Sequence, residues 1–564
     1  MEYLVHIVLA VFMLAIAEQG ARTELEVPWA IALLALAPYV IGTYSRVLYL
    51  RGKFVVSGWL WRGLHWCAPL LYALAVCVFG WPATIERWTG ASTSLLGWPS
   101  PGLLLGFAPF VVYQLATIDV RVRHTELDPT VRAATRRFHV RMFASGLVPT
   151  AIFAVGAWIV GQNEAWRVNV EHVGLYGMVF VLGSVGAFTL ALPWILRASW
   201  DTRSLEPGAL RSLLEDVSRH ARFRHHDLRV WNTGDLLANA AVVGMGPLDR
   251  VVLFSDVLLA SLSPREVVAV LAHEIGHAKR HHVLIFVAWT GAVFLAGDLV
   301  GREFENEWVS GGIVLALFGC WYKLFGWLSR RFELEADLFA LRLTRDPVGI
   351  VGALESVGGA HSRELDSWRH FSTAKRIAFV ERVAVDERVG HALERKLRAL
   401  TWLGGVLFVL AFGVSAQRLA ADLPRDRVIA ALALGEWSRA ESGAAELAER
   451  DLELSNWLSL IVDLSPEQRA EPGIAVVRAR TALAAGDAKR ALDWLTLEAL
   501  SGRRETLPVA DVLAEYVEVE AEELAAGRLP SFAPLAPRFA DAPEAWQAAA
   551  REHDAALERS RGSR

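Results

Sequence analysis

The chain has 564 residues, of which 54% are hydrophobic and 22 are tryptophan. This composition is too apolar for an ordinary soluble protein, and apolar runs of about 20 residues, long enough to cross roughly 30 Å of hydrocarbon, recur along the chain. The formal net charge is only −4 and there is no basic tract, so we expect no nucleic-acid partner. The three cysteines, Cys67, Cys77 and Cys320, lie inside apolar runs without the paired spacing of a disulfide framework or a zinc knuckle. These features predict a polytopic membrane protein.

Nine apolar segments are candidate membrane spans. The first is counted as a span because Met-Glu-Tyr lacks the positive charge that begins a signal peptide. The segments are 3–17, 27–49, 64–81, 102–118, 142–161, 173–196, 283–300, 311–328 and 400–416. We expect residues 1–196 to form an N-terminal transmembrane bundle of about six spans, and 400–416 to be the last span.

Positive charge in the short loops predicts the orientation of the spans, because Lys and Arg concentrate on the cytoplasmic side. The predicted loop 119–141 carries six arginines, whereas 161–171 and 301–310 are poor in positive charge. The basic loop is therefore assigned to the cytoplasm. Alternation along the chain then assigns 197–282 and 329–399 to the same side, and the segment after the last span to the opposite side.

The C-terminal tail, 417–564, is rich in Ala, Glu and Arg and has helical periodicity. Within it, Ala479–Leu492 combines small residues with a Gly-Asp turn, which is typical of a tetratricopeptide (TPR) helix pair. One or two such units are visible, whereas about three are needed for a stable stack. Two interpretations stay open, a TPR-like module that docks a partner or substrate and a generic helical cap.

The first motif with chemical potential follows a strong helix start. Ser263 and Glu266 form a capping box. His273 and His277 follow four residues apart, so their side chains project from one face of the helix. Two imidazoles in this arrangement can bind one Zn²⁺, and Glu274 beside the first can act as general base and general acid. The alternative is a solvated helix face.

Two observations favour the metal site over that alternative. Gly276 costs a helix about 1 kcal/mol relative to Ala, which suggests that something approaches the backbone there. A third ligand is also available, because Glu333 and Asp337 are again four residues apart and share a face. Glu333 can complete a His₂Glu site with one open position, and Asp337 can accept a hydrogen bond from a ligand imidazole. Glu335 stays open as a competing ligand, and a solvated acidic stripe as the structural alternative.

The two motifs, His273-Glu-Ile-Gly-His277 and Ser329-Arg-Arg-Phe-Glu333-Leu-Glu-Ala-Asp337, resemble those of the type 1 CAAX prenyl endopeptidases and their bacterial heat-shock membrane-protease relatives. The resemblance covers about residues 197–385 and includes the pair of spans between the two metal helices. It implies that Glu333 is the third zinc ligand and that Asp337 supports a ligand in the catalytic site. It also implies a mainly α fold, a polytopic α-helical membrane protein whose gluzincin-like zinc metallopeptidase domain, 197–399, combines helices with a small β-sheet.

The residues Asn239, Ala240, Ala241 and Val242 begin a segment that is similar to the edge strand of this family, with Arg250–Asp256 similar to the neighbouring strand. An edge strand leaves a row of backbone groups with which an extended substrate can pair. We therefore expect these four residues to bind substrate, a plain hairpin without a ligand being the alternative.

The segment Arg369–Ile377 is similar to the His-Pro-Ser…Arg-Ile segment of the family, with Phe371 in place of the proline. The resemblance implies that His370 and Arg376 approach the zinc, where either can stabilise the oxyanion formed during peptide hydrolysis. A capping or surface role is the alternative for His370.

Four other ionisable residues near the apolar runs are interpreted without a catalytic role. His281 and His282, which follow the zinc motif, are expected at the membrane interface. Asp298 and Lys323 lie near the ends of their spans, where charged side chains reach toward water.

The sequence thus predicts an integral-membrane zinc metalloendopeptidase with one Zn²⁺ per chain, acting in membrane-protein quality control or processing. We expect a multi-pass protein of the bacterial inner membrane with its active site on the cytoplasmic side. Its expected partners are an unfolded or membrane-associated polypeptide, the lipid bilayer, and a protein bound by the tail. Two alternatives remain: a client-binding scaffold or adaptor with little proteolysis, which has no need of Glu274, and CAAX-type processing of lipidated C-termini. A transporter is disfavoured because no paired repeat is visible.

Overall fold

The computed structural model describes most of the chain up to residue 447 and parts of the region after it. The described residues are 27–89, 102–125, 128–244, 249–301, 307–358, 364–434, 436–447 and 474–485, with 6, 7, 10, 13, 14, 246, 460, 464, 465, 468, 490, 493 and 494. Most of the first predicted span, 3–17, and much of the tail, 417–564, lie outside them.

All the regular elements described in the N-terminal part are helices. Its elements are α2 (Val27–Leu50), α3 (Phe54–Trp66), α4 (Ala68–Ala73), the π-helix η1 (Leu74–Val78), α5 (Trp81–Thr89), α6 (Gly102–Gly106), α7 (Ala108–Thr125), α8 (Pro129–Gly161), α9 (Glu164–His172) and α10 (Gly174–Ser199). A cluster of buried side chains that includes Tyr72, Phe110, Tyr113 and Phe143 joins several of these helices.

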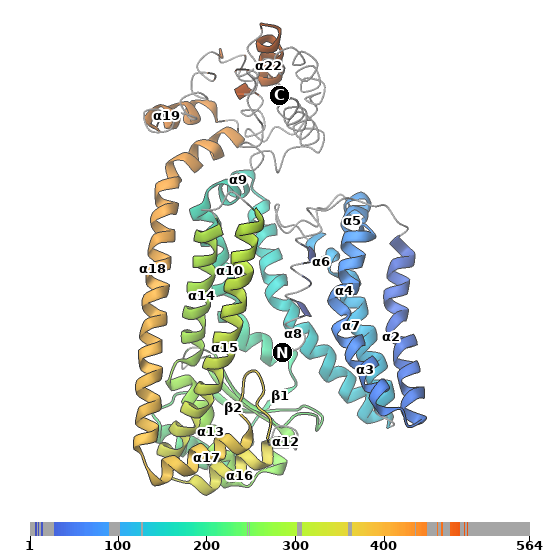
Figure 1. Ribbon diagram of the computed structural model, residues 1–564, viewed down its shortest axis with the longest axis vertical. Coiled ribbons are helices and arrows are strands. Elements are labelled where there is room, and N and C mark those ends of the chain that lie inside the picture. Colours follow the sequence, from blue (N-terminus) through green and yellow to red (C-terminus); the bar gives the residue numbers. More distant parts are fainter. Residues whose placement is uncertain are drawn as a thin grey trace, which may run out of the picture. The chain divides into compact units, whose positions relative to one another are not determined.

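The segment after α10 combines a small sheet with helices. The strands are β1 (Thr202–Ser204), β2 (Asp227–Trp231), β3 (Ala240–Val243) and β4 (Val251–Ser255). The helices are α11 (Ala209–His220), α12 (Asp256–Ser261), α13 (Pro264–Lys279), α14 (His282–Gly301), α15 (Glu307–Thr344), α16 (Pro347–Val357), α17 (Thr373–Val385) and α18 (Arg388–Ala433), followed by α19 (Trp437–Leu447) and α22 (Ile474–Ala484). Figure 1 shows α14 and α15 running side by side.

The four strands form one sheet in the order β1-β2-β4-β3. β2 and β4 are parallel, whereas β1 and β3 run antiparallel to their neighbours. All five residues of β4 are buried, as expected for a central strand. Because β3 pairs only with β4 among the described strands, it lies at one edge of the sheet, where the sequence predicts an edge strand.

Within the described residues, four helices are long and apolar enough to cross a membrane. They are α8, α10, α14 over His282–Val300, and α18. A pair of helices, Ala68–Val78 and Trp81–Thr89, is a fifth candidate if the two form one span, which is bent by 59°. The predicted fold class, a mainly helical polytopic membrane protein with a small sheet, is confirmed. The count of nine spans and the TPR-like character of the tail stay predictions.

Two boundaries predicted from the sequence differ from the structure. The apolar run 102–118 is broken near Phe107, where α6 ends and α7 begins, and the basic stretch 119–141 is mostly helical rather than a loop. In that stretch Asp119 accepts ion pairs from Arg123 at 2.8 Å and from Arg136 at 3.3 Å. The arginines are therefore spaced along the ends of α7 and α8, because charge sets the side of the membrane but does not end a helix.

The described residues belong to two compact units. One comprises 1–95, 101–155 and 183–416 and contains the sheet with the helices around it, and the other comprises 96–100, 156–182 and 417–564. In the second unit, Val168 and Val173 pack with Ala430 in a small apolar cluster, and the Asp426 carboxylate accepts a hydrogen bond from the Gly174 amide.

α13 is buried on two sides. Val267, Leu271 and Ile275 pack in the cluster that contains the sheet, whereas Ala272 packs with Leu338 of α15 in a second cluster. These two apolar faces hold the helix between the sheet and α15, so only the remaining stripe of its surface can carry polar side chains.

α13 and α15 cross at very short range. A Cβ added to Gly276 would lie 3.1 Å from Cα of Ala336 and 3.2 Å from its carbonyl oxygen. Both residues are fully buried. The absence of a side chain at Gly276 therefore allows the two backbones to approach, which accounts for a glycine in the middle of a helix.

We expect Gly276→Val to lower the free energy of unfolding by about 1–3 kcal/mol, the usual cost of overpacking a buried contact. Thermal unfolding in detergent measures the effect. Gly319→Val is the matched control, because Gly319 lies on α15 with nothing within 4 Å of an added Cβ. Equal unfolding midpoints for the two variants would contradict the role given to this crossing.

Candidate metal centre

The capping box at the start of α13 aligns the two histidines. Ser263 accepts a hydrogen bond from the backbone of Glu266, and the Glu266 carboxylate accepts one from the Ser263 amide at 2.8 Å. From this start the helix runs without interruption to His273 and His277, whose imidazoles therefore lie one turn apart on the same face.

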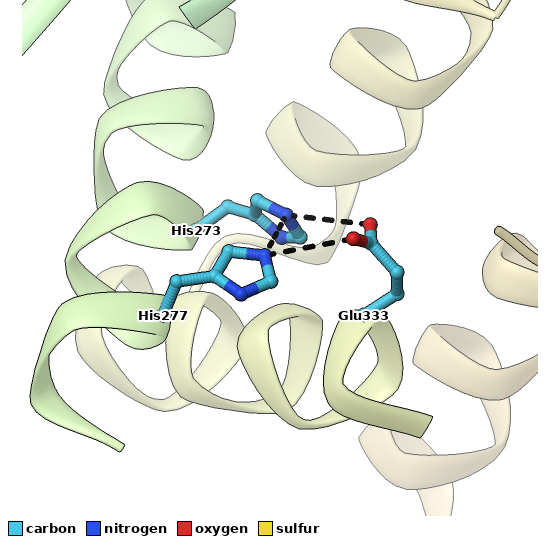
Figure 2. A group of neighbouring side chains, drawn as sticks. All are labelled: His273, His277 and Glu333. Carbon is cyan, nitrogen blue, oxygen red and sulfur yellow. Dashed lines mark hydrogen bonds and ion pairs between the residues drawn. The ribbon is translucent and has the colours of Figure 1, made fainter. Parts of the chain in front are cut away.

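Two histidines and one glutamate converge at the crossing of α13 and α15 (Figure 2). The Nε2 atoms of His273 and His277 lie 3.1 Å apart. Each lies 3.7 Å from one carboxylate oxygen of Glu333 on α15. Among the described residues these three form the one group of His, Cys, Asp or Glu side chains arranged to hold a metal ion. The structure thus brings together the three residues that the sequence proposes as ligands.

The two Nε2 atoms and the Glu333 carboxylate are arranged as ligands of a cation rather than as partners that bind one another directly. Nδ1 of His273 lies 2.9 Å from Asp337, and Nδ1 of His277 lies 2.7 Å from His282. If each Nδ1 carries the ring proton, both Nε2 atoms present lone pairs toward the same point, and Glu333 adds negative charge. Lone pairs at 3.1 Å repel one another unless a cation lies among them, which is the arrangement that a His₂Glu metal site requires.

Asp337 and Arg376 form a buried ion pair behind His273. The Arg376 guanidinium donates to both oxygens of Asp337, through Nε at 2.8 Å and through Nη2 at 2.7 Å. Its third nitrogen, Nη1, lies 3.2 Å from Glu333. Asp337 is 2% exposed, so its charge depends on this partner. Arg376 therefore binds the supporting carboxylate with two nitrogens and directs Nη1 toward Glu333, while Nη2 also lies 3.5 Å from Nδ1 of His273.

These contacts affect the charge states of two candidate ligands, Glu333 and His277. Burial by itself would raise the pKa of Glu333, but the hydrogen bond from His370 and the positive charge of Arg376 hold it well below its ordinary value. Burial lowers the pKa of His277 far below its usual range. A carboxylate and a neutral imidazole are the forms that bind a metal.

Glu274 lies between the candidate ligands and the edge of the sheet. Burial, together with the negative charge of Glu333, raises its pKa to about 7, against the lowering effect of His273. The backbone amide of Val242, on β3, donates a hydrogen bond to its carboxylate. The group expected to move protons is therefore anchored to the strand expected to bind substrate.

The edge strand directs alternate backbone groups away from the sheet. The Ser255 amide donates to the Asn239 carbonyl at 2.9 Å, so these two residues form a hydrogen-bonded pair of the antiparallel ladder. Alternation along such a ladder turns the backbone groups of Ala240 and Val242 away from β4, whereas those of Ala241 face it. The four residues predicted to bind substrate therefore differ in role, two of them facing outward.

His370 lies on the segment before α17 and reaches the candidate ligands from a third direction. Its Nδ1 lies 3.2 Å from Glu333, and its side chain is half exposed. The backbone around it is held by Ser367, whose hydroxyl accepts a hydrogen bond from the His370 amide at 2.9 Å. Phe371, which replaces the family's usual proline, therefore coexists with an approach of His370 to the site.

Two residues near the site escaped prediction. The sequence predicts His282 at the membrane interface, but its side chain is 2% exposed and its Nε2 lies 3.0 Å from Glu335. Glu335 was the competing ligand candidate, but it points toward His282 rather than toward the histidines of the metal group. The sequence does show His282 five residues after His277, just past the end of the helix. This spacing brings the two rings together only if the chain changes direction at His281, which the sequence does not show.

Comparisons with known proteins agree with these motifs. Residues 204–384 match the sequence profile of peptidase family M48. The chain is 26% identical over 255 residues to a protein named "Protease HtpX homolog" from Chlorobium phaeobacteroides, covering 40% of this chain and 83% of that protein. It is 32% identical over 145 residues to the "Protease HtpX homolog" of Dictyoglomus turgidum, covering 23% of this chain and 47% of that protein.

Among solved structures, the crystal structure of S. mikatae Ste24p matches with 15% identity and a TM-score of 0.40. The match covers 67% of this chain and 99% of that one.

We expect Arg376→Leu to destabilise the metal-free protein by about 3–5 kcal/mol, because Asp337 would be left buried without its cation. Thermal unfolding in the presence of a chelator measures the loss. Arg382→Leu on the same helix is the control, since Arg382 is exposed and its Nε donates to the backbone carbonyl of Ala378. Equal stability of the two variants would mean that the ion pair does not hold the site together.

Proposed function

Since the chain carries a domain of peptidase family M48 over residues 204–384, we propose that it is an integral-membrane zinc metalloendopeptidase. His273, His277 and Glu333 hold one Zn²⁺ per chain. The observation that carries this proposal is the convergence of the two Nε2 atoms and the Glu333 carboxylate at one point, with the other ring nitrogens already engaged. When bound, zinc lowers the pKa of a coordinated water and polarises the peptide carbonyl.

Glu274 is the general base and general acid in this proposal. A carboxyl group whose pKa lies near 7 can accept a proton from the attacking water and deliver it to the leaving amine at neutral pH. Its hydrogen bond from Val242 holds the carboxylate beside the strand along which the substrate would lie. The proton is therefore transferred next to the scissile bond.

Stabilisation of the oxyanion is assigned to two residues. His370 approaches from the exposed side, so its ring can donate toward a substrate oxygen in the open part of the site. Arg376 contributes positive charge through Nη1, and mainly positions Asp337 through its other two nitrogens. Asp337 in turn fixes the ring of His273.

The substrate is proposed to be an unfolded or membrane-associated polypeptide that adds a strand beside β3. Strand addition recognises backbone rather than side chains, so it suits a protease that removes damaged proteins of varied sequence. The candidate membrane helices support an integral-membrane setting. We extend the proposal to quality control or processing in a bacterial inner membrane, with the site on the cytoplasmic side and the tail, 417–564, as a docking element. The proposed domain division is that expected from the sequence, 1–196, 197–399, 400–416 and 417–564.

We expect Glu274→Gln to keep bound zinc but to cleave casein roughly 10²–10⁴-fold more slowly than the wild type, because only the proton transfer is lost. Cleavage by detergent-purified protein and zinc content are measured together. Glu355→Gln, at an exposed position on α16, is the control for loss of a carboxylate. If the wild type and Glu274→Gln both bind zinc but neither cleaves casein, the result would favour the adaptor or a narrow-specificity protease such as a CAAX-type enzyme. No zinc in either would refute the site.

We expect the backbone of the substrate to be read with a period of two. In a peptide that the enzyme cleaves, N-methylation of single amides should slow cleavage at alternate positions, each by roughly two- to tenfold for one lost hydrogen bond. Alanine replacement of the same substrate side chains is the control and should change the rate less. Losses at consecutive amides, or at none, would count against pairing with β3.

A further inference from the structure

The second candidate ligand, His277, contacts buried polar side chains that have no role in the proposed reaction. Its Nδ1 lies 2.7 Å from Nδ1 of His282, and Nε2 of His282 lies 3.0 Å from the Glu335 carboxylate. The His282 and Glu335 side chains are 2% and 9% exposed. Neither residue belongs to the three-residue group that can hold the metal. Three polar side chains thus form one line that begins at a candidate ligand and ends on α15.

The chemistry of the groups sets the direction of each hydrogen bond. The Glu335 carboxylate can only accept, so Nε2 of His282 carries a proton and donates to it. A neutral His282 then has a lone pair on Nδ1, which accepts from Nδ1–H of His277. His277 is left with its Nε2 lone pair toward the metal position, as a ligand needs.

A strained turn brings His282 back to His277. α13 ends at Lys279, and His281 adopts a positive φ of 56°, a conformation that non-glycine residues rarely take. α14 then begins at His282. The reversal turns the His282 ring under the last turn of α13, which a continuous helix would not allow.

The ring of His282 is also fixed from its flat side. It stacks on Phe332 with 4.2 Å between ring centroids and an angle of 7° between the planes. Phe332 is 2% exposed and directly precedes Glu333 on α15. One short segment of α15 thus supplies a metal ligand, the surface on which His282 stacks, and the carboxylate that His282 binds.

Arg280, just after the end of α13, contacts the far end of the line and shares a second partner with Arg342 of α15. Nε of Arg280 lies 3.8 Å from Glu335, and its Nη2 donates to Glu394 of α18 at 2.5 Å. Arg342 donates to the same Glu394 oxygen at 2.8 Å. Glu335 is therefore not an isolated buried charge, because it lies at the end of an alternating series of acids and bases.

We propose that His282 and Glu335 are positioning residues that orient the ligand imidazole of His277, as Asp337 orients that of His273. The inference rests on the proposed zinc site and deepens it. It predicts that both ligand rings are held from behind, one by a carboxylate directly and the other by a carboxylate acting through a second imidazole. Supports of this kind change metal affinity rather than the proton transfer, which belongs to Glu274.

The test compares His282→Phe with His282→Asn. Phenylalanine keeps the stack on Phe332 but cannot accept from His277, so we expect zinc to bind about 10–100-fold more weakly. Asparagine can place its amide oxygen near the position of Nδ1 and should restore most of the affinity. Zinc affinity is measured by chelator competition on the full-length protein. Visible absorption of the cobalt-substituted protein reports whether the ligand geometry has changed.

Controls separate positioning from folding. His281→Asn alters the exposed neighbouring histidine, tolerates the positive φ, and should match the wild type. Glu335→Gln keeps the side-chain shape and should weaken zinc toward the lower end of the same range if His282→Phe does not fold. If a folded His282→Phe or Glu335→Gln protein has wild-type zinc affinity and cobalt absorption, the positioning role of His282 and Glu335 is refuted and the proposed function is not affected. If the wild-type protein binds no zinc, both the positioning role and the proposed function are refuted.

Discussion

The candidate metal centre depends on how closely α13 and α15 approach at Gly276 and Ala336. The candidate ligands come from both helices, so the separation of the two backbones sets the distance between the imidazoles and the Glu333 carboxylate. Apolar contacts on both sides of α13 hold the helix in this position, between the sheet and α15. The arrangement of the polar side chains therefore requires a close approach of the two backbones, which the absence of a side chain at Gly276 allows.

Charge around the site is balanced in two groups, one behind each histidine. Behind His273, one arginine serves Asp337 with two nitrogens and Glu333 with the third. Behind His277, an imidazole separates the ligand from the carboxylate. Negative charge is thus close to one ring and more distant from the other, while the backbone of β3 holds Glu274 on the third side.

The sequence predicted those parts of the site that depend on helical periodicity. His273 with His277, and Glu333 with Asp337, are pairs four residues apart that each share one helix face, and the packing of α13 on α15 brings the two pairs together. The edge strand and the approach of His370 came from the family resemblance rather than from any local pattern.

The remaining features could not be read from local spacing because they depend on contacts between distant segments. His282 reaches His277 only through the positive φ at His281, and nothing in a pair of adjacent histidines marks that turn. Tertiary packing determines which nitrogens of Arg376 bind Asp337 and which one approaches Glu333. Strand register determines that the backbone groups of Ala240 face outward. The basic stretch 119–141 is predicted as a loop but is mostly helical, because its charge indicates the side of the membrane and not the conformation of the backbone.

α15 is a single uninterrupted helix of 38 residues, which corresponds to about 57 Å of rod. It contains the segment 311–328, which the sequence predicts to span the bilayer, and beyond that segment it carries Glu333, Glu335 and Asp337. A continuous hydrogen-bonded rod transmits tilt and rotation along its length with little loss. With 311–328 in the bilayer, as the sequence predicts, the lipid environment of one end and the ligand geometry at the other would be mechanically linked, and bilayer thickness would become a physical variable of the proposed site.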